Sequence, residues 1–576
     1  MPNTPSASWP ESSPTRTLLA IAVACATVWT CGALAQTPPD AGRLLEENRP
    51  VTRPTAPAAP KRLIEPPARP TVEMADGMTV TPSGFRIVGA SSFPESVLAE
   101  RVQPFIGRKL DLAGLNEAAG AITRLYQSAG QLLSYAYLPA QRVADGVIEI
   151  AVLEGRVEAV QVANAQEVRL RDEVVQAHMR DLIDAKPLRQ AEVERGLLLL
   201  NDIPGVVARA AFTPGASPGV AEVVVSVAEE EPLAGEVRID NHGSSSSGEY
   251  RVGVSLQFKD LFGYGDNTQA QFTASQRGSL VSGSLSTLVP LGGSGLKGGL
   301  SLSTLHYQLG GNFGKLGAEG AARTMAARMQ YPIVRSQLLN LNLEGVAERK
   351  WLSDDVQLAS RNHRKISDEA TARLTLDWRD AWLGPDAASS ASLGAVLGQL
   401  RLQDDQSRAD DGDVKTGLHT AGAFNKADLS LTRQQALWGP FSGYLRLAAQ
   451  FARHNLDSSE KLALGGPSAV RAYTPGEALV DDGRIGTLEL RYSQDYLGGN
   501  LLWSLFVERA LGRINISPAL GVGGNHVGLS GSGVGLQWTG GDIGLSASLA
   551  WRGSRLPTAE GGDPRPRLYF RFYYTP

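Results

Sequence analysis

YRVGVSLQF, residues 250–258, alternates apolar and polar side chains from end to end. Its even-numbered residues, from Tyr250 to Phe258, are all apolar or aromatic and share one face of an extended strand, while Arg251 and its odd-numbered companions share the other. The same alternation returns in ATARLTLDW, GYLRLAAQF, DIGLSASLAW and RLYFRFYY. A period of two repeated this often predicts antiparallel β-structure for residues 232–576.

The polar face of these strands admits two interpretations. In a soluble β-sandwich it would be the wet outer surface, whereas in an outer-membrane barrel it would line the lumen. The barrel is favoured by tryptophans near strand ends and by the aromatic strand close to the C-terminus. The lumen side would then carry Arg373, Asp377, Arg446, Gln450, Arg567 and Arg571, and the tryptophans are Trp378, Trp503, Trp538 and Trp551.

The length of this region predicts how many strands it holds. Roughly 344 residues, divided by about 21 residues for each strand and its loop, indicate an even number near sixteen. We therefore expect an all-β transmembrane antiparallel barrel of about 16 strands.

The overall composition excludes several other classes of protein. The 576 residues include 55 Lys and Arg against 59 Asp and Glu, a formal charge of -4, which disfavours nucleic-acid binding. A mean hydropathy of -0.13 argues against a bundle of membrane-spanning helices. The seven histidines lack metal-ligand spacing, and no phosphate-binding loop or catalytic constellation is visible. We expect no metal, no cofactor, no nucleotide and no enzymatic activity.

The N-terminal 35 residues predict an export signal. LLAIAVACATVW, residues 18–29, follows Arg16 and precedes the small residues around Ala35, after which we expect cleavage. A lipoprotein signal at Cys25 or Cys31 is the alternative. Because both cysteines would leave with the signal, the mature chain would contain no thiol.

A short helix and a linker are predicted next. In residues 36–49, Asp40 is placed to cap a helix whose apolar face carries Leu44 and Leu45. Prolines recur through residues 50–80, where they remove backbone donors and predict an extended linker.

Residues 81–156 and 157–231 repeat one order of elements, β-α-α-β-β, and predict two small α+β domains. In each, a strand precedes two helices and two further strands. The predicted helices are 94–104 and 111–129 in the first unit and 168–180 and 188–201 in the second, and the strands are GFRIVGA, LLSYAYLP and GVIEIAVLEG, then VEAVQVA, VVARAAF and AEVVVSVAE.

A long connection, residues 452–484, interrupts the strands of the barrel region. Its segment LALGGPSAVRAYTPGEALVDDG contains Gly465, Gly466 and Pro467, which would let it fold back on itself. In the later strand LLWSLFVER, alternation turns Phe506 and Glu508 into the lumen. We therefore expect the connection to fold inward and to bring an arginine to that glutamate.

The order of these segments resembles the outer-membrane transporters of two-partner secretion (TpsB), the haemolysin secretion/activation (ShlB/FhaC/HecB) family. The likeness covers essentially the whole mature chain, and AITRLYQSAGQLLSYAYLPAQRVADGVIEIAVLEGRV and LGGPSAVRAYTPGEA are close to family signatures. The loop motif VRGY of that family is matched by Val470, Arg471, Ala472 and Tyr473, and its F-x-D strand motif by Phe506 and Glu508. Ala472 stands where the family has glycine, and Glu508 stands where it has aspartate.

The resemblance implies a function. The two units would be polypeptide-transport-associated (POTRA) domains in the periplasm of a Gram-negative bacterium, and the helix of Leu44 and Leu45 would plug the lumen. The protein would recognise the secretion domain of an unfolded exoprotein, of adhesin or haemolysin type, and export it by type V secretion without catalysing a reaction. Its other partners would be outer-membrane lipid and, during biogenesis, barrel assembly machinery and periplasmic chaperones.

Two related functions remain alternatives at this stage. A barrel-assembly insertase shares the fold but usually differs in the number of docking domains, and a diffusion porin would not need the repeated units. The two predicted POTRA units and the predicted plug helix favour a secretion transporter over both alternatives.

Overall fold

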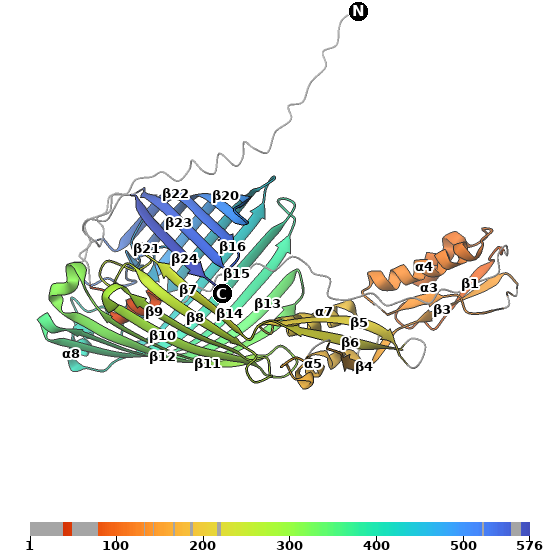
Figure 1. Cartoon of the computed structure of the whole chain (residues 1–576), viewed down its shortest axis with the longest axis horizontal. Coiled ribbons are helices and arrows are strands. Elements are labelled where there is room, and N and C mark those ends of the chain that lie inside the picture. Colours follow the sequence, from red (N-terminus) through yellow and green to blue (C-terminus); the bar gives the residue numbers. More distant parts are fainter. Residues whose placement is uncertain are drawn as a thin grey trace, which may run out of the picture.

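The computed structural model describes residues 38–48, 79–553 and 566–576, except 132, 142, 144, 165–166, 185–187, 216–219 and 521–523. The predicted signal peptide and nearly all of the predicted linker lie outside these residues. No helix within the described ranges is long and apolar enough to cross a membrane. A large barrel and an elongated arm beside it make up the molecule (Figure 1).

Sixteen antiparallel strands close into a barrel in which β24 pairs with β7, which confirms the predicted architecture and strand count. The strands are β7 (Leu233–Asp240), β8 (Arg251–Lys259), β9 (Asn267–Ser275), β10 (Leu280–Pro290), β11 (Lys297–Gln308), β12 (Ala318–Arg335), β13 (Leu339–Val356), β14 (Arg361–Asp380), β15 (Ala387–Leu402), β16 (Gly422–Ala436), β17 (Phe441–Ala452), β20 (Asp482–Tyr496), β21 (Gly499–Arg513), β22 (His526–Gly540), β23 (Ile543–Arg552) and β24 (Arg567–Tyr574). Their connections carry η2 (Gln276–Gly278), η3 (Gly311–Leu316), η4 (Gln357–Ala359) and α8 (Asp405–Gly412).

The two faces of β21 show why the alternating sequence forms a barrel. Trp503, Leu505 and Val507 are 48%, 59% and 55% exposed on the outer face, where lipid would cover them. Phe506 and Glu508, which alternate with them, are buried inside. Each strand thus matches an apolar exterior and a polar interior at the same time.

The first β-α-α-β-β unit is built from β1 (Gly84–Val88), α3 (Glu95–Val102), η1 (Gln103–Phe105), α4 (Leu112–Ser128), β2 (Tyr135–Tyr137) and β3 (Val147–Leu153). Its sheet has the order β1-β3-β2. Asp111 caps α4 by accepting a hydrogen bond from the Gly114 amide. The predicted helix 94–104 is shorter than expected because Pro104 lies in the 3₁₀ turn that follows α3.

The second unit comprises β4 (Arg156–Val162), α5 (Asp172–Met179), α6 (Asp181–Asp184), α7 (Gln190–Asn201), β5 (Val206–Pro214) and β6 (Val220–Glu229), with sheet order β4-β6-β5. Helix α5 begins after the predicted residue 168. The Glu229 carboxylate instead accepts hydrogen bonds from the amides of Arg169 and Leu170, at 3.0 and 2.8 Å. Those amides are therefore held outside the helix.

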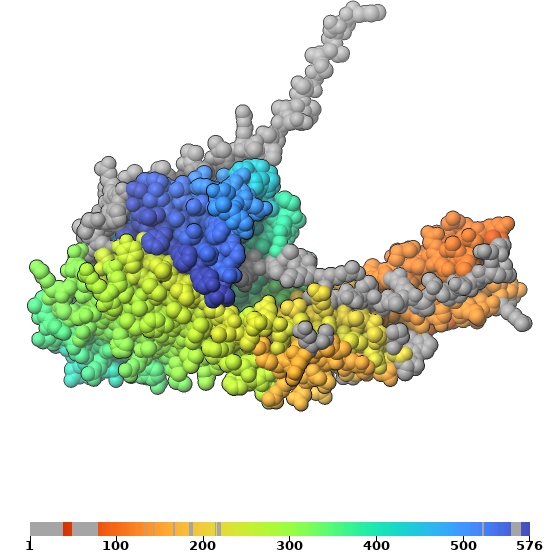
Figure 2. All heavy atoms as spheres, in the orientation of Figure 1, coloured from red at the N-terminus to blue at the C-terminus, as the bar shows by residue number. Residues whose placement is uncertain are grey.

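The two units are joined through a shared core. Leu133 follows α4 of the first unit but belongs to the hydrophobic core of the second. Beside it, the Gln190 amide donates to the Gly130 carbonyl at 2.7 Å. The two units therefore form one continuous arm, which extends away from the barrel (Figures 1 and 2).

The second unit is fixed to turns at one end of the barrel. Asp202, at the end of α7, accepts two hydrogen bonds from the Arg335 guanidinium, at 2.7 and 2.8 Å. Arg171 donates to the Tyr264 hydroxyl, and Glu194 accepts from the Gln337 amide. The arm joins this end of the barrel, which the resemblance places in the periplasm, so the opposite end would face the cell exterior.

Candidate functional site

A helix lies inside the barrel against its wall. Helix α2 (Ala41–Glu47) is capped by Asp40, whose carboxylate accepts from the Arg43 amide at 2.9 Å, as the sequence predicts. Ala41 and Leu44 are completely buried and Leu45 nearly so. They pack on an apolar patch of the inner wall that includes Leu280, Leu305, Tyr307 and Leu352.

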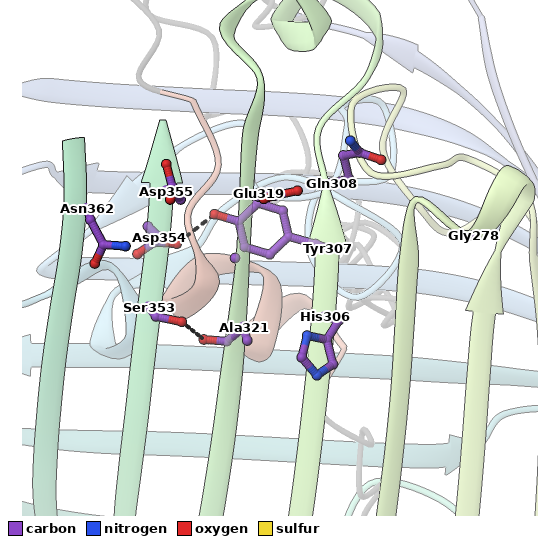
Figure 3. A pocket seen from close by; sticks show the side chains of 11 residues that line it. Gly278, His306, Tyr307, Gln308, Glu319, Ala321, Ser353, Asp354, Asp355 and Asn362 are labelled. Carbon is purple, nitrogen blue, oxygen red and sulfur yellow. Dashed lines mark hydrogen bonds between the residues drawn. The ribbon is translucent and has the colours of Figure 1, made fainter. Parts of the chain in front are cut away.

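A polar contact fixes the start of this helix to the wall. The Ala41 amide and the Tyr307 hydroxyl both donate to Asp354 Oδ1, each at 2.6 Å. Figure 3 shows Tyr307 on β11 and Asp354 on β13 with the helix behind them, beside a pocket that His306 and Glu319 also line. Both apolar packing and hydrogen bonds thus hold α2 in the lumen.

The connection between β17 and β20, residues 453–481, fills a further part of the interior. It contains η5 (Ser458–Glu460), β18 (Leu462–Ala463) and β19 (Leu479–Val480), and β18 pairs with β19. Gly466 has a φ of 115°, and a side chain at Gly465 would meet the Thr474 carbonyl at 2.6 Å. Both glycines are needed for the fold of the loop, and half-buried Pro467 follows them.

Arg471 projects from this loop onto the inner wall. Its amide donates to Glu508 Oε2 at 2.7 Å, and its Nε donates to Glu508 Oε1 at 2.6 Å. The guanidinium also lies 3.5 Å from the centre of the Phe506 ring. The structure therefore brings together the arginine and both residues of the strand motif that the sequence singles out.

A second carboxylate, which the sequence analysis missed, completes the arginine site. Arg471 Nη2 donates to Glu489 Oε1 at 2.6 Å, and Glu489 also accepts from Arg491. Glu489 lies opposite Phe506 in the register of β20 and β21. The alternation of β20, which turns Thr487, Glu489 and Arg491 inward, is the signal that would have found it.

The two departures from the family motif have local explanations. Ala472 is not among the described residues with positive φ, so its methyl group causes no backbone strain. That methyl faces Gly531 of β22, where a side chain would lie only 2.8 Å away. The longer side chain of Glu508 accepts from both the backbone and the side chain of Arg471.

The remaining motif residues are buried around the arginine. Val470 and Tyr473 are completely inaccessible and belong to the hydrophobic cluster between the loop and the inner wall. Tyr473 accepts a hydrogen bond from the Tyr569 hydroxyl through its carbonyl, at 2.7 Å. Arg552 donates to the Ala472 carbonyl at 2.9 Å. The motif is thus docked on β21 to β24.

A second ionic cluster holds the N-terminal part of the 453–481 loop, which precedes β18. Glu460 of η5 pairs with Lys350 and, at 2.9 Å, with Lys426. Lys350 also lies 3.0 Å from Glu369, and its side chain is completely buried. Gln450 donates to the Glu460 carbonyl. The sequence predicts a lumen position for Gln450 but does not single out Lys350, Glu369 or Lys426, because their strands are far from Glu460 in sequence.

Helix α2 and the loop also contact each other. Lys365 Nζ lies 3.1 Å from Asp40 Oδ2 and 2.8 Å from Asp457 Oδ2, so one barrel lysine binds both. Arg43 donates to the Pro475 carbonyl at 3.2 Å. The two elements form one polar assembly inside the barrel.

No cluster of three or more His, Cys, Asp or Glu side chains that could hold a metal occurs among the described residues. The site is built instead from ion pairs, hydrogen bonds and apolar packing. Such an arrangement can hold and release protein segments within a lumen.

Comparison with known proteins matches both parts of the chain. Residues 219–538 match the haemolysin secretion/activation protein ShlB/FhaC/HecB family, and residues 80–155 match the ShlB-type POTRA domain. The heme/hemopexin transporter protein HuxB of Haemophilus influenzae strain 86-028NP is 24% identical over 517 residues, 87% of this chain and 88% of HuxB.

Two solved structures share the fold. CdiB from Escherichia coli has a TM-score of 0.66 at 21% identity, covering 88% of this chain and 92% of CdiB. BamA from Haemophilus ducreyi lacking POTRA domains 1–3 has a TM-score of 0.51 at 13% identity, covering 86% of this chain and all of that one. Since the family match extends over more than half of the residues, the chain belongs to the haemolysin secretion/activation ShlB/FhaC/HecB family of two-partner secretion transporters in the outer membrane.

Proposed function

We propose that the arm recognises the secretion domain of an unfolded partner exoprotein, of adhesin or haemolysin type, and passes it into the barrel for export. The protein is an outer-membrane protein-secretion transporter with POTRA domains in the periplasm. The observation that carries the proposed mechanism is that α2 and the 453–481 loop occupy the lumen without belonging to the barrel wall. Both can therefore move while the barrel stays closed.

The second unit, which lies next to the barrel, offers an edge for the cargo. Among the described strands, β5 pairs only with β6, so its other edge is open. Val207 on this strand is 41% exposed. An extended polypeptide could add to such an edge through backbone hydrogen bonds, which demand little of its sequence.

Export then requires the lumen to be cleared. A predicted linker of residues 50–80 could reach up to about 100 Å when extended, which is longer than the barrel is tall. Helix α2 could leave while still attached. Folding of the cargo outside the cell would supply the driving force, and we propose that the transporter catalyses no covalent step.

Further partners follow from the location of the protein. We propose that outer-membrane lipid covers the apolar exterior and that barrel assembly machinery and periplasmic chaperones act during biogenesis, with no role for nucleic acid or nucleotide. The insertase alternative has only the likeness to the BamA fold in its favour, and the family match favours secretion.

A deletion strain tests export. Without the transporter, the exoprotein should accumulate in the periplasm and disappear from the medium, and normal release would contradict the proposal. A photo-crosslinking residue at Val207 tests recognition by trapping cargo in transit. Ile183 of α6, which is 40% exposed, is the matched control position and should give no crosslink. Equal crosslinking at both positions would reject the β5 edge.

A further inference from the structure

Four arginines point outward from neighbouring strands β12 to β15. On β13, Trp351 is 39% exposed to the outside, and Arg349 has the same parity, with a side chain that is 51% exposed. Strand register places Asp368 opposite Arg349, and Arg401 opposite Ile366, two residues from Asp368. The group, called here the outer arginine cluster, consists of Arg323, Arg349, Arg364 and Arg401.

The cluster lies at a particular depth on the barrel exterior. The outward residues of β13 from Leu339 to Ala347 include no charge. Leu339 lies near the periplasmic end, and Arg349 is ten residues further along the strand. Ten residues rise about 33 Å, and a tilt of about 45° reduces this to about 24 Å along the barrel axis. The apolar band of such barrels is about 25 Å tall, so Arg349 lies where hydrocarbon gives way to the headgroups of the outer leaflet.

The arginines greatly outnumber the carboxylates that neutralise them. The Asp368 carboxylate accepts hydrogen bonds from both Arg349 and Arg401. Arg323 and Arg364 form no ion pair within the described part of the chain. Asp368 therefore holds two guanidinium groups side by side. Glu319 and Asp355 have the same outward parity but lie opposite each other, further towards the end of their strands.

Stabilisation of the barrel does not account for this arrangement. Exposed ion pairs contribute little to folding free energy, and the guanidinium groups of Arg323 and Arg364 form no ion pair with any described residue. Arg401 is 42% exposed at its side chain, so donors remain available on the outside. The Trp351 ring, 5.9 Å from the Arg349 guanidinium, adds the amphipathic surface typical of a membrane boundary.

We propose that the outer arginine cluster binds the phosphate groups of the phosphorylated glycolipid that forms the outer leaflet, lipopolysaccharide. Guanidinium groups match phosphate oxygens in charge and in paired hydrogen-bond geometry. The cluster faces the lipid and not the lumen, at the depth at which such phosphates lie. This site is independent of the cargo and of the loop that carries Arg471.

The test uses the full-length protein, purified in detergent, and diphosphorylated lipid A as the probe. Native mass spectrometry measures binding to the wild type and to the double variant Arg349→Gln/Arg401→Gln. At about a fivefold contribution for each basic residue, the double variant should bind about thirtyfold more weakly. Arg408→Gln is the control, since Arg408 is also exposed but lies on extracellular helix α8.

Two further measurements separate lipid binding from a purely structural role. Asp368→Asn removes a carboxylate and should leave binding equal or stronger, whereas a loss as large as that of the double variant would overturn the proposal. Fully dephosphorylated lipid A should bind about as weakly to the wild type as the intact lipid does to the double variant. Equal binding of both lipids, or displacement by inorganic phosphate at equal concentration, would also overturn it. If the double variant does not show the heat-modifiable mobility of a folded barrel, Arg323→Gln alone should still weaken binding about fivefold.

Discussion

Ser458 Oγ lies 2.7 and 2.6 Å from the two carboxylate oxygens of Asp40. This contact joins the residue that caps helix α2 to the loop that carries Arg471. Lys365 binds the same carboxylate from the barrel wall. Departure of α2 from the lumen would therefore break contacts of the loop, and movement of the loop would remove contacts of α2.

Loss of the Asp40 carboxylate should open the barrel. Asp40→Ala removes the cap of α2, which is worth about 1 kcal/mol, and its contacts with Ser458 and Lys365. We expect higher ion conductance in planar bilayers, and a still higher value when residues 40–49 are deleted. Asp405→Ala, on exposed helix α8, is the control and should conduct like the wild type. Unchanged conductance in the deletion would show that α2 does not block the pore.

Arg471→Ala should abolish secretion while the barrel remains inserted. The substitution leaves the buried carboxylates of Glu508 and Glu489 without their shared arginine. Stranding a buried charge costs about 3 to 5 kcal/mol, which is enough to undock the loop. Exoprotein in the medium measures secretion, and heat-modifiable mobility measures folding. Normal secretion by this variant would show that the docked arginine is dispensable.

Exchange of the two charges should restore secretion only in part. Arg471→Glu with Glu508→Arg recreates one ion pair but places the new glutamate beside Glu489, which is 2.6 Å from the present guanidinium. Adding Glu489→Gln should raise secretion above that of the double variant. If neither combination secretes more than the single variants, the pair acts through something other than its attraction.

Glu460→Gln should lower the stability of the folded protein. The change leaves the buried ammonium of Lys350 and the neighbouring Lys426 with one fewer carboxylate. We expect a loss of about 3 kcal/mol or more, seen as a lower temperature for loss of heat-modifiable mobility. Glu319→Gln, at an exposed site on β12, should behave like the wild type. Equal temperatures for Glu460→Gln and the wild type would contradict a stabilising role for this cluster.

The first POTRA domain should lose stability in acid through Glu154. Burial by itself raises the pKa of this carboxyl group, but hydrogen bonds from Ser91, Ser92 and Tyr126 outweigh it and lower the pKa to about 2. The stabilisation is complete above the ordinary pKa of 4.5 and disappears as the pH falls towards 2. Glu154→Gln should lower the melting temperature of the arm by about 4 °C at pH 7. At pH 3 the difference in melting temperature between Glu154→Gln and the wild type should be smaller. A difference that does not change with pH would show that the ionised carboxylate of Glu154 is not the stabilising group.

The barrel could be predicted because each strand has two chemically different surroundings. Lipid outside and water or protein inside impose a period of two on each strand. This period is visible in the sequence of residues 250–258 and predicts the inward position of Glu508. The inward loop could be anticipated from its glycines and from the family motif that contains Arg471. Asp40 likewise predicts the start of helix α2 from local sequence alone, as the prolines of residues 50–80 predict an extended linker.

The assembly inside the lumen could not be predicted in the same way. Lys350 and Glu460 are separated by 110 residues, and their contact depends on the register of several strands. Asp40 and Lys365 meet across a still longer separation. No local pattern encodes such distances, so the contacts emerge only when the barrel closes. The alternation of β20 predicts that Glu489 points inward, but Glu489 was missed because it lies outside the family motif.

Leu133 ties the stability of one POTRA domain to the presence of the other. A transporter truncated to begin at the second domain would lack this side chain, and the cavity so created would cost about 3 kcal/mol by analogy with leucine truncations. Its failure to secrete would report a damaged neighbour as well as a missing recognition surface. Point substitutions on the exposed faces of the first domain are consequently the cleaner way to map where the exoprotein binds.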